Sequence, residues 1–181
     1  MQIIQRPSGP NSRTPATSRH ASLHCSRLMR IPSKRLLNAE LTTEVGRPVV
    51  RLEVVNVSEG DTLEFAIAST SGSWRQGIWL GVHGELEVGG ARGDQYVVWT
   101  DTAPRSFQVR VAKTDDGLLR FYNVWDSGRG RKMESQSATS GMLVDEADGL
   151  VTYRCNDIGL SPRFDKLVFE LRRELSTASP G

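Results

Sequence analysis

The segment LLRFYNVWDSGRGRKMESQSATSGMLVDEADGLVTYRCND, residues 118–157, decides what the rest of the chain can be. Its two apolar-rich parts, residues 118–125 and 150–156, flank a polar span, residues 126–141, that holds only two apolar side chains. Loops longer than about 12–15 residues are uncommon in compact domains and are usually functional or disordered. We therefore expect two strands that carry the packing, and a loop between them that carries the contacts.

Upstream and downstream of this segment, apolar and polar residues alternate with a period of two, which predicts half-buried strands. The link His83-Gly84 predicts a tight hairpin, and the pairs Asp116-Gly117 and Asp148-Gly149 predict two more, because Asp-Gly between alternating segments favours hairpin turns. The predicted strands are residues 49–57, 63–69, 77–82, 85–88, 96–100, 106–112, 118–125, 141–146, 150–155 and 166–172.

About ten short strands with turn residues between them are typical of an all-β, antiparallel two-sheet β-sandwich and not of βαβ units. We expect this domain over residues 48–174, followed by a frayed C-terminal tail over residues 175–181. Its core should come from Val50, Leu52, Leu63, Phe65, Ile67, Trp79, Val97, Trp99, Val109, Val111, Leu119, Phe121, Val151, Tyr153, Leu167 and Phe169.

Residues 1–47 are rich in Ser, Pro and Arg, with no acidic residue before Glu40. Such a composition holds too little apolar surface to bury, so it predicts a disordered N-terminal arm. Within it, residues 33–44 favour a short helix, because Leu36, Leu37 and Leu41 fall at helical spacing.

Charge and hydropathy exclude two classes of partner. The chain has 23 Lys and Arg and 21 Asp and Glu; 8 and 2 of these precede residue 48, so the remainder carries 15 and 19 and a net charge of −4. An acidic domain lacks the cationic surface that binds nucleic acid. No apolar run approaches the roughly 18 residues of a membrane span. The absence of a signal-peptide pattern and of paired cysteines favours the cytoplasm.

Polar and aromatic residues around the long loop predict a carbohydrate site. A pyranose has an apolar C–H face, which an aromatic ring can contact, and hydroxyl groups, which bind amides, carboxylates and guanidinium groups. The leading prediction is therefore a non-enzymatic, lectin-like module for carbohydrate or another small polar ligand, without a cofactor. Its expected ligand-binding residues are Trp125, Asp126, Arg129, Arg131, Gln136, Asn156 and Asp157.

Two alternatives remain open. A glycoside-type hydrolase would use two carboxylates as acid and base or nucleophile, drawn from Asp126, Glu134, Asp157 and Asp165. A protein-interaction domain would use the arginine loop, residues 128–132, because glycines and guanidinium groups can bind carboxylates or phosphates on a partner.

Residues 156–169, NDIGLSPRFDKLVF, resemble the D-x-D-F-x-D-L-V-F ending of some secreted calcium-binding β-sandwich domains. The matching residues include Asp157, Phe164 and Asp165. The resemblance implies a calcium site, but Arg163 and Lys166 stand where ligating carboxylates would be needed. We therefore expect no metal.

Overall fold

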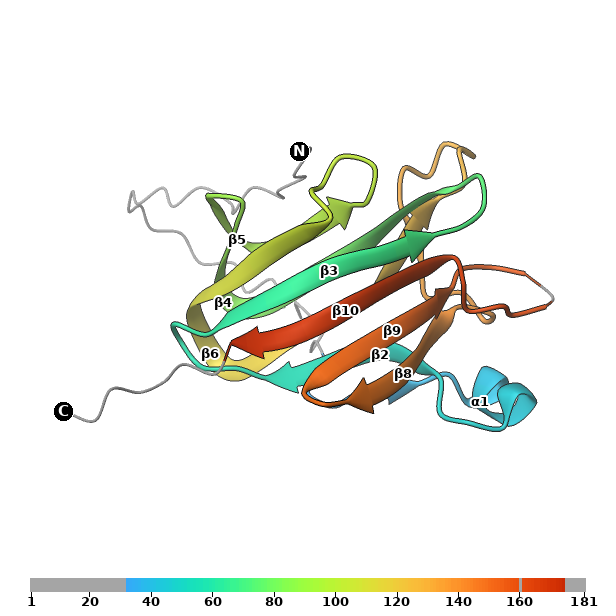
Figure 1. Cartoon of the computed structure of the whole chain (residues 1–181), viewed down its shortest axis with the longest axis horizontal. Coiled ribbons are helices and arrows are strands. Elements are labelled where there is room, and N and C mark those ends of the chain that lie inside the picture. Colours follow the sequence, from blue (N-terminus) through green and yellow to red (C-terminus); the bar gives the residue numbers. More distant parts are fainter. Residues whose placement is uncertain (1–31, 160, 175–181) are drawn as a thin grey trace, which may run out of the picture.

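The structure is a computed structural model and describes residues 32–159 and 161–174. Within these ranges the chain forms ten antiparallel strands and one short helix (Figure 1), which confirms the prediction of an all-β antiparallel protein. Residues 1–31 of the expected arm, and the expected C-terminal tail, lie outside the described residues. The elements are β1 (Leu36–Leu37), α1 (Ala39–Val45), β2 (Val50–Asn56), β3 (Thr62–Thr70), β4 (Arg75–Val88), β5 (Ala91–Trp99), β6 (Ser106–Asp126), β7 (Glu134–Ser135), β8 (Gly141–Ala147), β9 (Leu150–Asn156) and β10 (Leu167–Glu174).

The strands form one sheet that closes on itself, instead of the two separate sheets of a sandwich. β2 pairs with β8 through Val50 and Met142, and it also pairs with β6 through Glu53 and Phe121. From β8 the pairing continues through β9, β10 and β3 back to β6. These six strands make a closed barrel, and β1, β4, β5 and β7 lie outside it. The sandwich expectation is thereby corrected, because β2 links strands that a sandwich would leave in different sheets.

Two of the expected hairpins are bends within long strands. β4 has 14 residues and β6 has 21, and they pair with each other from Arg75 and Asp126 to Val88 and Val109. The chain turns a corner at Gly84, where φ is 144° and the register shifts. A glycine with an unusual φ marks a bulge as well as a hairpin, so the local sequence pattern alone did not separate the two.

The third expected hairpin is confirmed. β8 and β9 pair from Gly141 and Asn156 to Ala147 and Leu150. Asp148 and Gly149 both have positive φ, 52° and 77°, as the tight turn between twisted strands requires.

The core fills the barrel with aromatic rings. Phe65 meets Phe121 edge-on at 5.5 Å between ring centroids, and Tyr153 stacks on Phe169 at 4.8 Å. All the expected core residues are buried except Ile67, Trp79 and Val151, which are partly buried. A separate apolar cluster lies on the other face of β4, β5 and β6, and comprises Trp79, Val97, Trp99, Tyr122 and Val124.

The beginning of the described chain packs against the barrel. The helix expected over residues 33–44 is shorter, because Leu36 and Leu37 pair with β2 as β1. Leu41 of α1 is 1% exposed and packs with Leu143 and Phe164. Residues 36–45 are thus part of the folded domain, although composition places them in a disordered arm. No helix in the described ranges has the length and apolarity needed to cross a membrane.

Candidate ligand-binding site

Three of the expected site residues come together, but they are buried. Trp125, Asn156 and Asp157 are 1%, 2% and 2% exposed. Gln76 Nε2 donates to Asp157 Oδ2 at 3.1 Å, and Asn123 Nδ2 donates to the Asn156 carbonyl at 3.1 Å. These contacts hold the strand ends together. Trp125 has no exposed ring face for a sugar, so the expected stacking role of this residue is corrected.

The burial of Trp125 follows from its place in β6. It pairs with Gln76 of β4 on one edge and with Glu134 of β7 on the other. Successive side chains of a strand point to opposite faces, so Trp125 shares its face with the core residue Phe121. This periodicity was present in the sequence and could have predicted the burial of the indole ring.

The long polar loop is an anchored hairpin. β7 pairs with the end of β6, and residues 127–133 form the tip. Asp126 Oδ1 accepts a hydrogen bond from the Gly128 amide at 2.8 Å, and Glu134 accepts from the amide and hydroxyl of Ser127. The Ser127 hydroxyl, with smaller contributions from the nearby arginines, lowers the pKa of Glu134. The expected contact residues of this loop, Arg129, Arg131 and Gln136, are all exposed.

Next to the loop tip lies a cavity of about 220 Å³, which we call the aromatic pocket. One wall is Trp79, whose ring stacks on Tyr122 with centroids 4.8 Å apart and planes 17° apart. The Trp79 ring also covers Gly81, since a Cβ at that glycine would lie 2.2 Å from a ring carbon. The pocket is lined by Trp79, Gln95, Tyr96, Val97, Trp99, Lys132 and Met133.

Trp99, another residue of the pocket lining, is held in place by Arg75. The Arg75 guanidinium lies 4.5 Å from the ring centroid, and Arg75 Nε donates to Asp101 Oδ1 at 2.8 Å. Stacking of a guanidinium on indole and its pairing with a carboxylate both fix the ring. Among the described residues, the buried Trp99 Nε1 has no hydrogen-bond acceptor. The pocket therefore has a rigid aromatic wall and an unused donor beside it.

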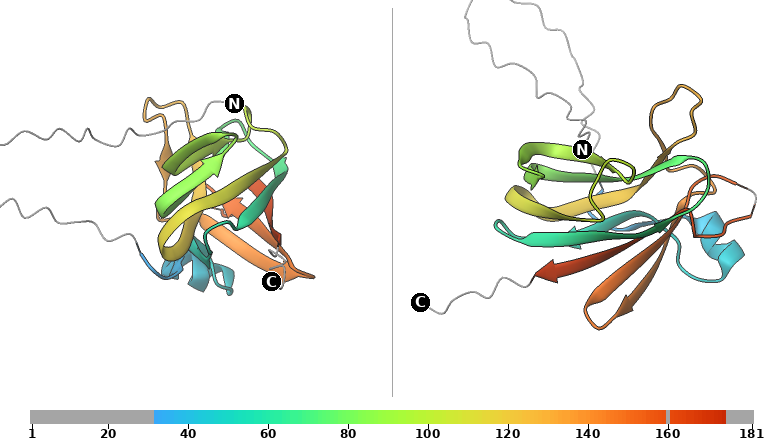
Figure 2. Two further views of the ribbon diagram at one scale, coloured as in Figure 1. Left: turned by 90° about the vertical axis from the view of Figure 1, so that its left-hand side faces the viewer. Right: turned by 45° about the horizontal axis from the view of Figure 1, so that its top comes forward.

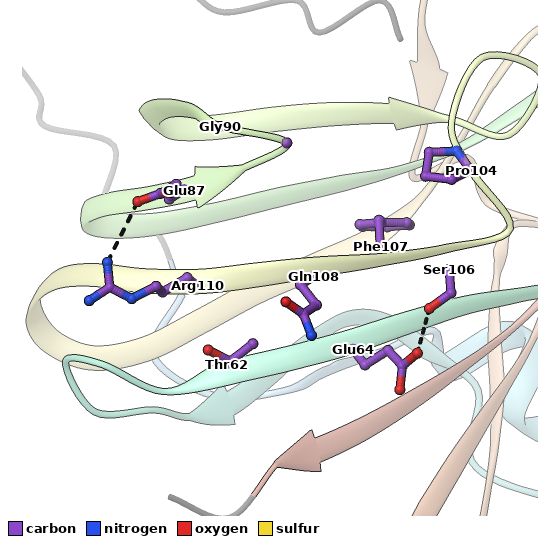
Figure 3. Close-up of a pocket in the computed structure, with 10 residues that line it drawn as sticks. Thr62, Glu64, Glu87, Gly90, Pro104, Ser106, Phe107, Gln108 and Arg110 are labelled. Atoms are coloured by element: carbon purple, nitrogen blue, oxygen red, sulfur yellow. Dashed lines mark hydrogen bonds and ion pairs between the residues drawn. The ribbon is translucent and has the colours of Figure 1, made fainter.

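A further cavity, about 560 Å³, is a polar groove between β3, β6 and the β4–β5 turn (Figure 3). Its charged groups have partners within the groove: Arg110 pairs with Glu87 at 3.6 Å, and Glu64 accepts a hydrogen bond from the Ser106 hydroxyl at 2.5 Å. Its aromatic residue, Phe107, is 7% exposed. The groove thus lacks the exposed ring that a sugar face would contact.

A smaller cavity, about 240 Å³, is bordered by one expected residue, Asp157, although this residue is only 2% exposed. Asp157 lines it together with Trp74 and Lys166. Both carboxylate oxygens of Asp157 already accept hydrogen bonds, from Gln76 and from the Ile158 amide. Asp157 therefore mainly stabilises the fold, although it also borders this cavity.

The carboxylates of the hydrolase alternative are engaged within the fold. Asp126 and Glu134 stabilise the loop, and Asp157 bonds to Gln76. Asp165 pairs with Arg163 at 3.3 Å and with Lys166 at 3.8 Å. In the part of the chain that the structure describes, no three His, Cys, Asp or Glu side chains gather as metal ligands would.

Comparison with known proteins adds no relative. No protein-family model, curated protein or solved structure matches this chain.

Proposed function

We propose that this protein is a non-enzymatic binding module for carbohydrate, and that the aromatic pocket with its adjoining loop is the binding site. The observation that carries the proposal is the Trp79 ring, which is partly buried, supported by Tyr122 and Gly81, and lines a cavity at the foot of a polar loop. A rigid aromatic ring beside polar groups suits the two-faced chemistry of a sugar.

The polar partners are arranged around this ring. Gln95 and Lys132 line the pocket and can donate to sugar hydroxyls, and Gln95 can also accept. Arg129 and Arg131 stand on the same loop and are exposed, so they can extend the contact to a larger or acidic saccharide. Trp125 has no part in the revised site, because it is buried.

The hydrolase and the protein-interaction domain would each require different groups of the loop. A hydrolase needs two carboxylates free to exchange protons and to reach a scissile bond. Asp126 and Glu134 are instead hydrogen-bonded to the loop backbone. A protein-interaction domain would use the arginines and have no need of the aromatic pocket.

The test compares Trp79→Ala with Trp74→Ala. Glycan-array binding followed by calorimetry on the best glycan should show at least about a tenfold loss of affinity, roughly 1.4 kcal/mol, for Trp79→Ala. Trp74 is also partly buried but lines a different cavity, so Trp74→Ala should bind as the native protein does. Circular dichroism of both variants checks that the fold is retained.

Further variants separate the alternatives. Binding that persists in Asp126→Asn and Glu134→Gln, without turnover of the glycan, favours a binding module over a hydrolase. The interaction domain would be favoured by two results together. The native protein would bind no glycan but capture a protein partner, and the Arg129→Ala, Arg131→Ala double variant would lose that partner. Native-like glycan binding by Trp79→Ala would contradict the proposed site.

A further inference from the structure

Another cavity, which we call the barrel mouth, opens at the other end of the molecule from the polar loop. The end of β10, the end of β2 and the β8–β9 hairpin meet there (Figure 1). Figure 2 shows the same three elements together from another direction. The cavity measures about 380 Å³, within the range of small-molecule sites. Its lining is Arg35, Val55, Glu146, Gly149, Val151, Tyr153, Leu171 and Arg173.

The walls of the barrel mouth are apolar. Val55, Val151 and Leu171 come from β2, β9 and β10, and all three pack against or belong to the main core. Tyr153 is 1% exposed and stacks on Phe169. Burial in this setting, with the charge of Glu53 nearby, raises the pKa of the Tyr153 hydroxyl, which therefore stays neutral. An apolar ligand body entering here would be shielded from water on several sides.

A buried carboxylate fixes an arginine at the entrance. Glu53 is fully buried; Arg35 Nε donates to its Oε1 at 2.8 Å, and Arg35 Nη2 forms an ion pair with its Oε2 at 2.8 Å. The Arg35 side chain is itself 43% exposed and lines the cavity. Buried ion pairs add little to stability compared with apolar residues of similar size. The arrangement is better explained as orientation of a guanidinium, which has five N–H donors and uses only part of them on Glu53.

We propose that the barrel mouth binds a small carboxylate with an apolar body, such as a medium-chain fatty acid. Arg35 and Arg173 contact the carboxylate, Glu53 is a positioning residue that acts through Arg35, and Val55, Val151 and Leu171 enclose the body. This site is separate from the aromatic pocket and does not depend on the proposed carbohydrate function.

The charged groups at the entrance include two donors for an anion and two carboxylates that limit its affinity. Arg173 donates to the carbonyl of Asn56, which holds its guanidinium near the end of β2. Glu146 lines the same entrance and opposes an anionic ligand. The negative charge of Glu53 faces Arg35 from the buried side. Two guanidinium groups and one exposed carboxylate therefore face an incoming ligand, so removing Glu146 should strengthen the binding of an anion.

The experiment titrates the full chain with decanoate, decanol and decylamine by calorimetry. These probes share one apolar body and differ in head group. Decanoate should bind at least about tenfold more tightly than decanol, since a hydrogen bond between charged groups exceeds a neutral one. Arg173→Gln should remove most of that difference, and Glu146→Gln should increase it. Glu53→Gln should weaken decanoate more than decanol, because its effect passes through Arg35.

A cavity-filling variant locates the probe. Val151→Phe should abolish binding of decanoate and decanol, while Trp79→Ala should leave both unchanged. Because Val151→Phe can disturb folding, amide chemical shifts of the native protein provide a second measurement, and decanoate should perturb Val55, Val151 and Leu171. Three results would overturn the proposal: no binding of decanoate by the native protein, tighter binding of decylamine, or shifts confined to residues outside the barrel mouth.

Discussion

At the scale of single residues, Arg120 is a charged side chain that is almost completely buried, at 1% exposed. A buried guanidinium is tolerated only when its donors are bound. Its Nη2 donates to Asp116 Oδ2 at 2.6 Å, Nε donates to the Pro32 carbonyl at 2.7 Å, and Nη1 donates to the Leu118 carbonyl at 3.1 Å. Alternation in β6 places Arg120 away from the barrel core, so its burial depends on cover from the segment that begins at Pro32.

The ion pair between Asp116 and Arg120 makes the stability of the fold depend on pH. Burial opposes ionisation of Asp116, but hydrogen bonds and charge from Arg120 outweigh it and lower the pKa of the carboxyl. A carboxyl with a lower pKa in the folded state stabilises the fold above its unfolded pKa, about 3.9, and loses that contribution as the pH falls. Asp116→Asn should therefore cost about 1.5–3 kcal/mol at pH 7.

The measurement is urea unfolding of native protein and variant at pH 7 and at pH 3. The difference between the two stabilities should be smaller at pH 3 than at pH 7, because the unfolded state binds the proton first and the contribution of Asp116 declines as the pH falls from its unfolded pKa toward the lowered pKa of the folded state. Asp115→Asn is the matched control, because Asp115 is exposed and pairs with the surface residue Lys113 at 3.3 Å. It should change stability by no more than about 0.5 kcal/mol at either pH. A constant difference for Asp116→Asn would contradict the assignment.

At the scale of elements, α1 is tied to the far end of the polar loop. Asn38 is its N-cap and accepts from the Leu41 amide at 3.2 Å. The same side chain donates through Nδ2 to the carbonyls of Ala138 and Ser140, at 2.8 Å and 2.9 Å. One amide therefore satisfies a helix end and a loop about 100 residues away. This contact explains why a short helix remains folded against the barrel.

Two substitutions at Asn38 separate these roles. Asn38→Asp keeps the oxygen that accepts from the Leu41 amide but loses both hydrogen bonds that Nδ2 donates to the loop. Asn38→Ala loses all three hydrogen bonds. Asn38→Ala should cost about 2–3 kcal/mol, above the usual cost of about 1 for a cap. Hydrogen exchange should become faster at Ser140 in both variants, but at Leu41 mainly in Asn38→Ala. Equal protection of Ser140 in Asn38→Asp and native protein would show that the donors do not hold the loop.

At the scale of the whole molecule, alternation predicts most strands but not how they close. β2, β3, β8, β9 and β10 lie where the period-two pattern places them. Closure depends on the pairing of Val50 with Met142, which are 92 positions apart, and no local pattern contains it. The corners in β4 and β6 carry the same residues as hairpin turns. Whether the chain bends or reverses there depends on the neighbouring strand.

For the candidate binding sites as well, local sequence predicts some residues, whereas the others depend on contacts between distant parts of the chain. The exposed arginines and Gln136 of the loop follow from polarity alone. The aromatic pocket was not predicted, because Trp79 alternates like a core residue and its exposure depends on Tyr122 and Gly81 beside it. The barrel mouth was not predicted either, since it joins Arg35 of the expected arm to Glu53 of β2.

The bend at Gly84 allows the path of β4 to be tested by adding a single methyl group, through the substitution Gly84→Ala. A Cβ at Gly84 would lie 2.2 Å from the carbonyl oxygen of Lys113, so β4 and β6 could not keep their pairing at the bend. Gly90 also has a positive φ, 81°, but a Cβ there meets nothing within 4 Å. Gly90→Ala therefore carries only the backbone penalty, about 1–2 kcal/mol. Gly84→Ala adds a backbone clash and should cost at least about 2 kcal/mol more than Gly90→Ala in urea unfolding. If both substitutions cost the same, β4 would not pass through this corner as a single strand, and the expected hairpin at His83-Gly84 would be restored.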